Sequence, residues 1–190
     1  MMRHLRNLAA LLTLSLLTIS AGPADDGRWY AGDYSFSDEL GGFSILSVTG
    51  SGTKADPIEI REQLDSANPV TLVIRSGNNA LGEGGLHLRV VPTNNSGLAW
   101  IEFEFELQEI RGKPSDFYDG LSFDQINPDP DLISSNRFAH FKSNFESFDR
   151  LRFSEGHVDP RDRPVFGFLI TDVTPVGEFY LLQDPRVPFS

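Results

Sequence analysis

Apolar and polar residues alternate with a period of two along much of this chain, and helical periodicity is rare. The clearest alternation runs from Ala99 to Leu107. Ile101, Phe103, Phe105 and Leu107 share one parity, and Glu102, Glu104 and Glu106 share the other. Because successive side chains of a strand point to opposite faces, this segment predicts a half-buried antiparallel strand. Ile110 falls on the wrong parity, which predicts a bulge near Gln108 or the end of the strand there.

Shorter alternations recur on both sides of this segment, and clusters of Gly, Pro, Asn and Asp separate them. They cover residues 43–48, 58–64, 70–75, 86–91, 151–153, 165–172 and 178–182. Short strands divided by turn residues are typical of sandwiches, whereas parallel βαβ units need long amphipathic helices between strands. We therefore predict an all-β fold, an antiparallel β-sandwich of the Ig-like or jelly-roll-like kind.

One segment departs from the period of two. Phe138, Phe141, Phe145 and Phe148 are spaced by three, four and three residues, which would align them on one face of a helix. Two interpretations stay open: a short helix near 138–148 that crosses one end of the sandwich, or an irregular loop whose rings close that end. Both make these phenylalanines part of the packing.

The N-terminal segment has the three parts of a secretory signal peptide. Arg3, His4 and Arg6 form a basic start, an apolar run extends from Leu8 to Ile19, and small residues follow. The run is shorter than the roughly 17–25 residues of a membrane span. We expect cleavage after Ala21 or Ala24, so that residues 1–24 are removed and 25–190 fold as one domain with no integral membrane span. The protein is then exported, to a periplasm or out of the cell.

Composition narrows the classes of function. The chain of 190 residues has no cysteine, which excludes disulfides, cysteine nucleophiles and Cys-ligated metals. Its net charge is −11, with 16 basic and 27 acidic residues. Loss of two arginines with the signal peptide leaves 14 basic against 27 acidic residues, a net charge of −13. Such a chain is not expected to bind nucleic acid, because phosphate recognition needs a face rich in Lys and Arg.

Carboxylates offer the one enzymatic interpretation, since the chain lacks the G-x-S-x-G, H-E-x-x-H and phosphate-loop motifs. Glu102, Glu104 and Glu106 form an acidic stripe, and adjacent like charges raise the pKa of a carboxyl as a general acid requires. A carbohydrate-active hydrolase could use such a pair. The simpler interpretation is a polar face whose glutamates pair with arginines on neighbouring strands, namely Arg61, Arg75, Arg89 or Arg152. His87, on the polar parity of its segment, is expected at the surface.

A second acidic cluster lies in a predicted loop. It consists of Asp116, Asp119, Asp124, Asn127, Asp129 and Asp131. Calcium takes six to eight oxygen ligands, which closely spaced loop acids can supply, so these residues are candidate ligands of a structural calcium ion. The alternative is an acidic loop exposed to solvent. Leu132 and Phe138 stand where an EF-hand would need its glycine and its bidentate glutamate, so the EF-hand pattern is not met.

Aromatic residues give the candidate ligand-binding surface. Trp29, Tyr30, Tyr34 and Trp100 could stack on the sugar rings of a glycan or contact a protein partner, and they could equally pack the core or an edge. Asn94 begins an Asn-Asn-Ser triplet that matches an N-glycosylation acceptor. Together, these patterns predict an exported, soluble, non-catalytic β-sandwich with a binding or structural role in the cell envelope or outside the cell. The alternative is a hydrolase that uses the strand carboxylates.

Overall fold

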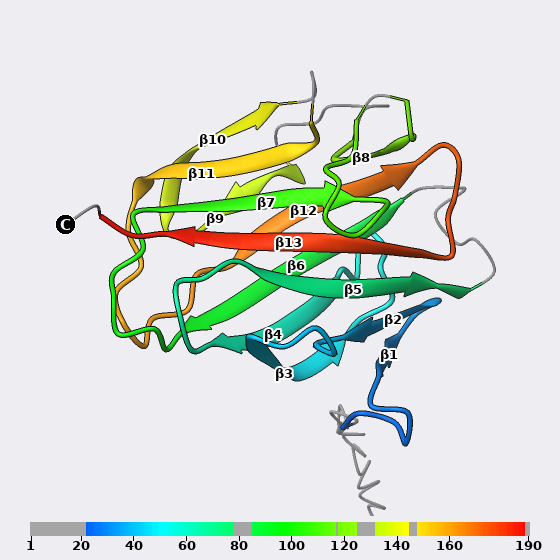
Figure 1. The fold of residues 1–190 in the computed structure, drawn as a ribbon, viewed down its shortest axis with the longest axis horizontal. Coiled ribbons are helices and arrows are strands. Elements are labelled where there is room, and N and C mark those ends of the chain that lie inside the picture. Colours follow the sequence, from blue (N-terminus) through cyan, green and yellow to red (C-terminus); the bar gives the residue numbers. More distant parts are fainter. Residues whose placement is uncertain (1–21, 78–84, 117, 125–131, 145–147, 189–190) are drawn as a thin grey trace, which may run out of the picture.

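Thirteen strands form two packed sheets in the computed structural model, which describes residues 22–77, 85–116, 118–124, 132–144 and 148–188 (Figure 1). The larger sheet has seven strands. In spatial order they are β1 (Trp29–Ala31), β2 (Tyr34–Ser37), β5 (Val70–Ser76), β13 (Glu178–Arg186), β7 (Glu102–Gln108), β11 (Arg150–Gly156) and β10 (Phe138–Asn144).

The smaller sheet has six strands. Its order is β3 (Phe43–Thr49), β4 (Ile58–Leu64), β6 (Leu86–Asn94), β12 (Phe166–Asp172) and β8 (Leu121–Ser122), and β9 (Ser134–Ser135) also pairs with β12. The prediction of an all-β sandwich is therefore confirmed. Each of the eight alternating segments corresponds to one of the strands β3, β4, β5, β6, β7, β11, β12 and β13, although the segments 99–107 and 165–172 begin before the first residue of their strands.

The pairing between strands is antiparallel except for β4 and β6, which run parallel, with Ile58 opposite Leu88. The chain leaves the smaller sheet after β4, forms β5 in the larger sheet and then returns as β6. This excursion reverses the chain twice, so β6 runs in the same direction as β4. The alternation of residues predicts each strand, and the route of the chain between the sheets determines its direction.

Phenylalanine rings hold the two sheets together. The ring of Phe103 in β7 lies 4.7 Å from that of Phe166 in β12, and Phe105 lies 4.9 Å from Phe168. Phe153 of β11 is 4.9 Å from Phe166. All five side chains are almost fully buried. Offset and tilted ring pairs of this kind stabilise a core beyond the area that they bury, and no disulfide is present.

The predicted strand at 99–107 begins later than its sequence pattern suggests. Regular pairing starts at Glu102, and Trp100 forms an isolated bridge with Val158. As a result Trp100 is fully buried and Ile101 is 41% exposed, the reverse of the predicted parity at these two positions. At its other end the strand stops at Gln108, as Ile110 indicated.

Neither interpretation of the segment 138–148, a short helix or an irregular loop, holds for residues 138–144, which form the strand β10 and pair with β11. Phe138 and Phe141 nevertheless both contact the core, at 6.0 Å from Phe166 and 6.4 Å from Phe153. In β11, Glu155 has a φ of +58° and lies next to Gly156, the register partner of Phe138. Phe145 lies outside the described residues, and Phe148 is 42% exposed.

Candidate functional site: a groove on the smaller sheet

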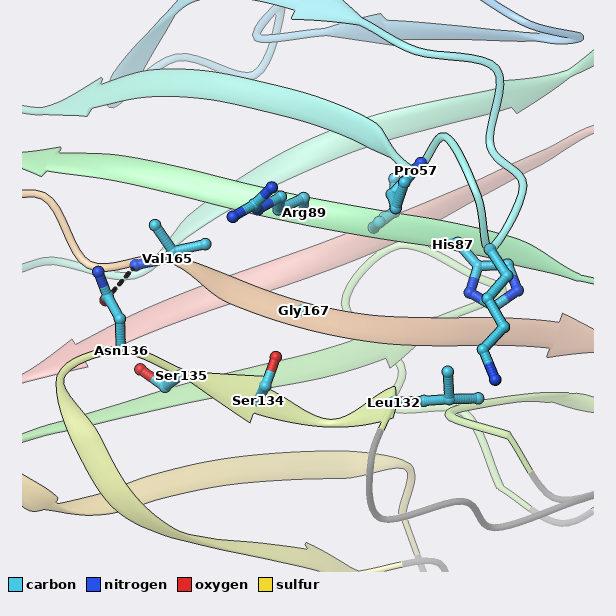
Figure 2. A pocket seen from close by; sticks show the side chains of 11 residues that line it. Pro57, His87, Arg89, Leu132, Ser134, Ser135, Asn136, Val165 and Gly167 are labelled. Carbon is cyan, nitrogen blue, oxygen red and sulfur yellow. Dashed lines mark hydrogen bonds between the residues drawn. The ribbon is translucent and has the colours of Figure 1, made fainter.

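A groove of about 510 Å³ crosses the outer face of the smaller sheet (Figure 2). This volume lies within the range of small-ligand sites. Polar side chains from three parts of the fold converge on it. Its lining comprises Lys54, Pro57, His87, Leu88, Arg89, Leu132, Ser134, Ser135, Asn136, Val165 and Gly167.

Gly167 explains why the surface is hollow here. It lies in β12 between Arg89 of β6 and Ser134 of β9, which are its register partners on the two sides. A Cβ atom at this glycine would come within 2.8 Å of Ser134 Oγ. Backbone therefore forms the floor of the groove, and the side chains of β6 and β9 form its walls (Figure 2).

The wall on β6 follows from the alternation of that strand. Leu86, Leu88 and Val90 point into the core, so His87 and Arg89 emerge on the outer face. The guanidinium of Arg89 is 54% exposed, and its nearest carboxylate oxygen, from Glu59, lies 3.8 Å away. That distance is too long for a hydrogen bond. Two residues of the same strand thus present nitrogen atoms to the groove.

A tight loop before β4 brings a third nitrogen to this wall. The amides of Ser51, Gly52 and Thr53 donate to the carbonyl oxygen of Asp56, at 3.0 to 3.2 Å. This folding places Lys54 beside His87. Burial of the imidazole, followed by the charge of Lys54, lowers the pKa of His87, and Asp124 opposes the shift. His87 is therefore mainly neutral at pH 7 and can both donate and accept hydrogen bonds.

The opposite wall consists of hydroxyl and amide groups held by the backbone. Asn136 Oδ1 accepts a hydrogen bond from the Val165 amide at 2.8 Å, which Figure 2 marks as a dashed line. Ser135 Oγ accepts from the amide of Arg137 at 3.2 Å. Ser134 Oγ makes no hydrogen bond within the described part of the chain and faces the groove (Figure 2). This wall is preformed, with one hydroxyl ready to bind a ligand.

The groove differs in charge from the chain as a whole. Lys54 and Arg89 line it, and no carboxylate does so among the residues that the structure describes. The nearest acid to Arg89, Glu59, pairs more closely with Arg61, at 2.7 Å. The sequence patterns predict His87 at the surface and Arg89 as a possible partner of the glutamate stripe, and they do not reveal this groove. The usable signal is a glycine on the outward parity of the buried strand Phe166–Asp172, although the sequence does not reveal which residues flank it.

The glutamate stripe lies on the opposite side of the sandwich, on the larger sheet. Glu104 and Glu106 are 6% and 4% exposed, because arginines from neighbouring strands cover them. Arg152 pairs with Glu104 at 2.8 Å, and Arg150 pairs with Glu106. The expected pairing with Arg152 is therefore present. The other three arginines do not reach the stripe. Arg61 pairs with Glu59, Arg75 pairs with Glu39 and Glu178, and Arg89 approaches Glu59 only to 3.8 Å.

The four candidate aromatic residues do not form one surface. Trp100 is fully buried and Tyr34 is 6% exposed, so neither ring offers a stacking face. Trp29 is half-buried against the core, and Tyr30 is 57% exposed. Tyr30 and one edge of Tyr34 line a second hollow of about 470 Å³, together with Arg28 and the already paired Arg75.

The acidic loop is described only in part, since Asn127, Asp129 and Asp131 lie outside the described residues. Asp116 and Asp119 use their carboxylates to accept backbone amides: Asp116 from Tyr118 at 2.9 Å and Asp119 from Leu121 at 3.1 Å. Asp124 is 5% exposed. Within the described ranges, no three His, Asp or Glu side chains are grouped so that they could hold a metal ion.

Asn94, the candidate glycosylation acceptor, is fully buried. Its Nδ2 donates to the carbonyl oxygens of Leu98 and Val158, at 2.8 and 3.0 Å, and its Oδ1 accepts from the Ser96 hydroxyl at 2.7 Å. In the folded protein this amide is a structural hydrogen-bonding group and is not accessible for modification.

Two further findings concern the whole chain. Over the ranges described here, no helix has the length and apolar character that crossing a membrane requires. Comparison of the chain with protein-family models, curated protein sequences and solved structures found no match.

Proposed function

We propose that this protein is an exported, non-catalytic β-sandwich that binds a saccharide in the groove between β6 and β9. The observation that carries the proposal is the floor at Gly167, which lies between a wall of nitrogen donors and a wall of hydroxyl and amide groups. Saccharides present hydroxyls along their edges and apolar C–H faces. The lining combines Ser134 and His87 with the apolar Pro57, Leu132 and Val165, a mixture suited to both.

The state of the glutamates supports binding over hydrolysis. A retaining or inverting glycosidase needs two carboxyls that flank the bond to be broken, one of them free to donate a proton. Glu104 and Glu106 instead lie beneath the guanidinium groups of Arg150 and Arg152. Lys142 and these two arginines line the small hollow beside Glu104, without an aromatic ring. The neighbouring carboxylate, Asp184 of β13, lies opposite Glu104 and is itself paired with Arg186 at 2.8 Å.

Groove binding can be tested with a panel of immobilised oligosaccharides and a variant that fills the floor. Gly167→Leu places a side chain in the groove, and its backbone φ is ordinary, so the substitution introduces no backbone strain. Gly177→Leu is the matched control, because it makes the same change at the second hollow. We expect Gly167→Leu alone to abolish binding. Loss only in Gly177→Leu would move the site to the second hollow and refute the groove.

Hydrolysis and export have separate tests. Cleavage of any glycan by the native protein that disappears in Glu104→Gln would replace binding with the hydrolase alternative.

For export, the N-terminus of the protein recovered from outside the cytoplasm should be Gly22 or Asp25, as cleavage after Ala21 or Ala24 requires. Recovery of the chain with its first residues intact in the cytoplasm would contradict export.

A further inference from the structure

The charged lining of the groove points to a narrower class of ligand. We infer that the groove binds a saccharide bearing an oxyanion, either a uronate carboxylate or a sulfate ester, with Arg89 and Lys54 as the groups that recognise it. This inference rests on the proposed function and specifies its ligand. It follows from three observations: an arginine whose hydrogen-bonding capacity is unused, a second cation on the same wall, and a lining without carboxylates in the described residues.

Arg89 carries the first step. The carboxylate nearest to Arg89, that of Glu59, lies 3.8 Å away. By comparison, Arg152 on the larger sheet pairs with Glu104 at 2.8 Å. Guanidinium groups recognise planar or tetrahedral oxyanions through paired N–H donors. Arg89 makes no such hydrogen bond within the described chain, so its donors are available to a ligand in the groove. Its backbone position is fixed by pairing with Gly167.

The second step concerns the other groups that a ligand would meet. Lys54 adds a cation on the wall of β6, while Ser134 and Asn136 offer uncharged polar groups on the wall of β9. A saccharide lying across Gly167 would place its acidic group toward one wall and its hydroxyls toward the other. Neutral His87 lies on the same wall as Arg89 and can donate to a hydroxyl or a carboxylate.

The overall negative charge of the chain does not prevent this recognition. At physiological ionic strength the Debye length is about 8 Å, so exposed carboxylates beyond that distance are largely screened. Groups in direct contact with the ligand are screened much less. The charge distribution therefore favours an anion inside the groove and disfavours extended binding of a polyanion elsewhere on the surface.

Paired ligands that differ only in charge provide the test. Calorimetric titrations at physiological salt would use hexagalacturonate and its fully methyl-esterified form, then sulfated and unsulfated cellohexaose. We expect one of the charged ligands to bind about tenfold more tightly than its neutral partner, the effect of one charge-assisted contact. The pair that shows the preference identifies whether the oxyanion is a carboxylate or a sulfate.

Variants assign that preference to residues. Arg89→Gln should remove most of it, and Arg28→Gln, which changes an arginine at the second hollow and leaves Glu59 and the groove untouched, should retain it. Melting curves would verify that both variants fold. Equal binding of charged and neutral ligands, lost in Gly167→Leu, would overturn the oxyanion inference and leave saccharide binding intact. An unchanged preference in Arg89→Gln would also overturn it, and failure of all four ligands to bind would overturn both proposals.

Discussion

Gln183 Nε2 donates a hydrogen bond of 3.1 Å to Glu62 Oε2 in the interior between the two sheets. Both side chains are fully buried, and the remaining oxygens, Glu62 Oε1 and Gln183 Oε1, have no hydrogen-bond partner among the residues that the structure describes. Burial raises the pKa of Glu62 to about 8, the bond from Gln183 opposes this, and the charge of Asp38 adds to it. The carboxyl is therefore protonated in the native protein at neutral pH.

This arrangement predicts a stability that falls with increasing pH. Between the ordinary pKa of 4.5 and about 8, the native protein keeps a proton that the unfolded chain has released. The free energy of unfolding contributed by Glu62 is thus greatest below about pH 4.5 and is lost as the pH rises through about 8. Urea unfolding at about pH 5, 7 and 9 should show this decline.

Glu62→Gln should flatten the decline, since an amide does not titrate in this range and can also donate to Gln183 Oε1. At about pH 9 the variant should therefore be more stable than the native protein. Glu59→Gln, on the outer face of the same strand, should retain the native slope. Identical slopes for the native protein and Glu62→Gln would show that Glu62 is not the responsible group.

Because arginines cover Glu104, we expect that removing its charge lowers the stability of the protein. Glu104→Gln removes the ion pair with Arg152 and the weaker contact with Arg186, and we expect a loss of about 1.5–3 kcal/mol in the free energy of unfolding. Glu102→Gln, at the half-buried start of the same strand, should cost less than about 0.5 kcal/mol. Chemical denaturation measures both values. Equal losses would mean that the burial of Glu104 has no energetic consequence.

Because the side chain of Asn94 is buried and hydrogen-bonded, we expect that substituting it lowers the stability of the protein. Asn94→Asp keeps the size of the side chain but removes the donors to the carbonyls of Leu98 and Val158. We expect a loss of about 1–3 kcal/mol in stability at neutral pH. Asn68→Asp, at an exposed position, should be nearly neutral. A glycan found on Asn94 of the folded protein would contradict this assignment.

The two aromatic candidates farthest apart in exposure should respond differently to truncation. Trp100→Ala empties a fully buried position and should cost about 3–5 kcal/mol. Tyr30→Ala removes an exposed ring whose hydroxyl donates to Asp26 at 2.7 Å, and should cost less than about 1 kcal/mol. Thermal unfolding distinguishes the two. Similar melting temperatures for both variants would refute the core role of Trp100.

Much of the fold could be predicted because strand alternation is a local property. The segments around Ile58, Phe105 and Phe168 alternate, and each forms a strand with the expected residues in the core, except for Ile101, which precedes β7 and is exposed. The Phe138 segment was the main error. Its spacing fits a helix, yet residues 138–144 pair with β11 as a strand, and the rings of Phe138 and Phe141 still contact the core.

The candidate site was less accessible to sequence reasoning. Gly167, Arg89 and Ser134 are far apart in the chain, and only strand pairing across β12 makes them neighbours. For the glutamate stripe, the sequence predicts the strand but not the burial of its carboxylates. Glu104 and Glu106 are buried because arginines of β11 cover them. Glu62, in contrast, occupies the apolar parity of its strand, so a buried acid could have been suspected from sequence.

The all-β class, the strand segments, the phenylalanine-rich core and the absence of disulfides can be predicted from residue types and from the period of two alone. The parallel direction of β4 and β6, the ion pairing of Glu104 and Glu106, and the groove around Gly167 cannot be predicted in this way. Those features depend on which strands become neighbours. Which strands pair is determined by how the chain crosses between the two sheets. Local residue patterns do not specify this route, because the free energy gained by packing the two inner faces together depends on the whole core.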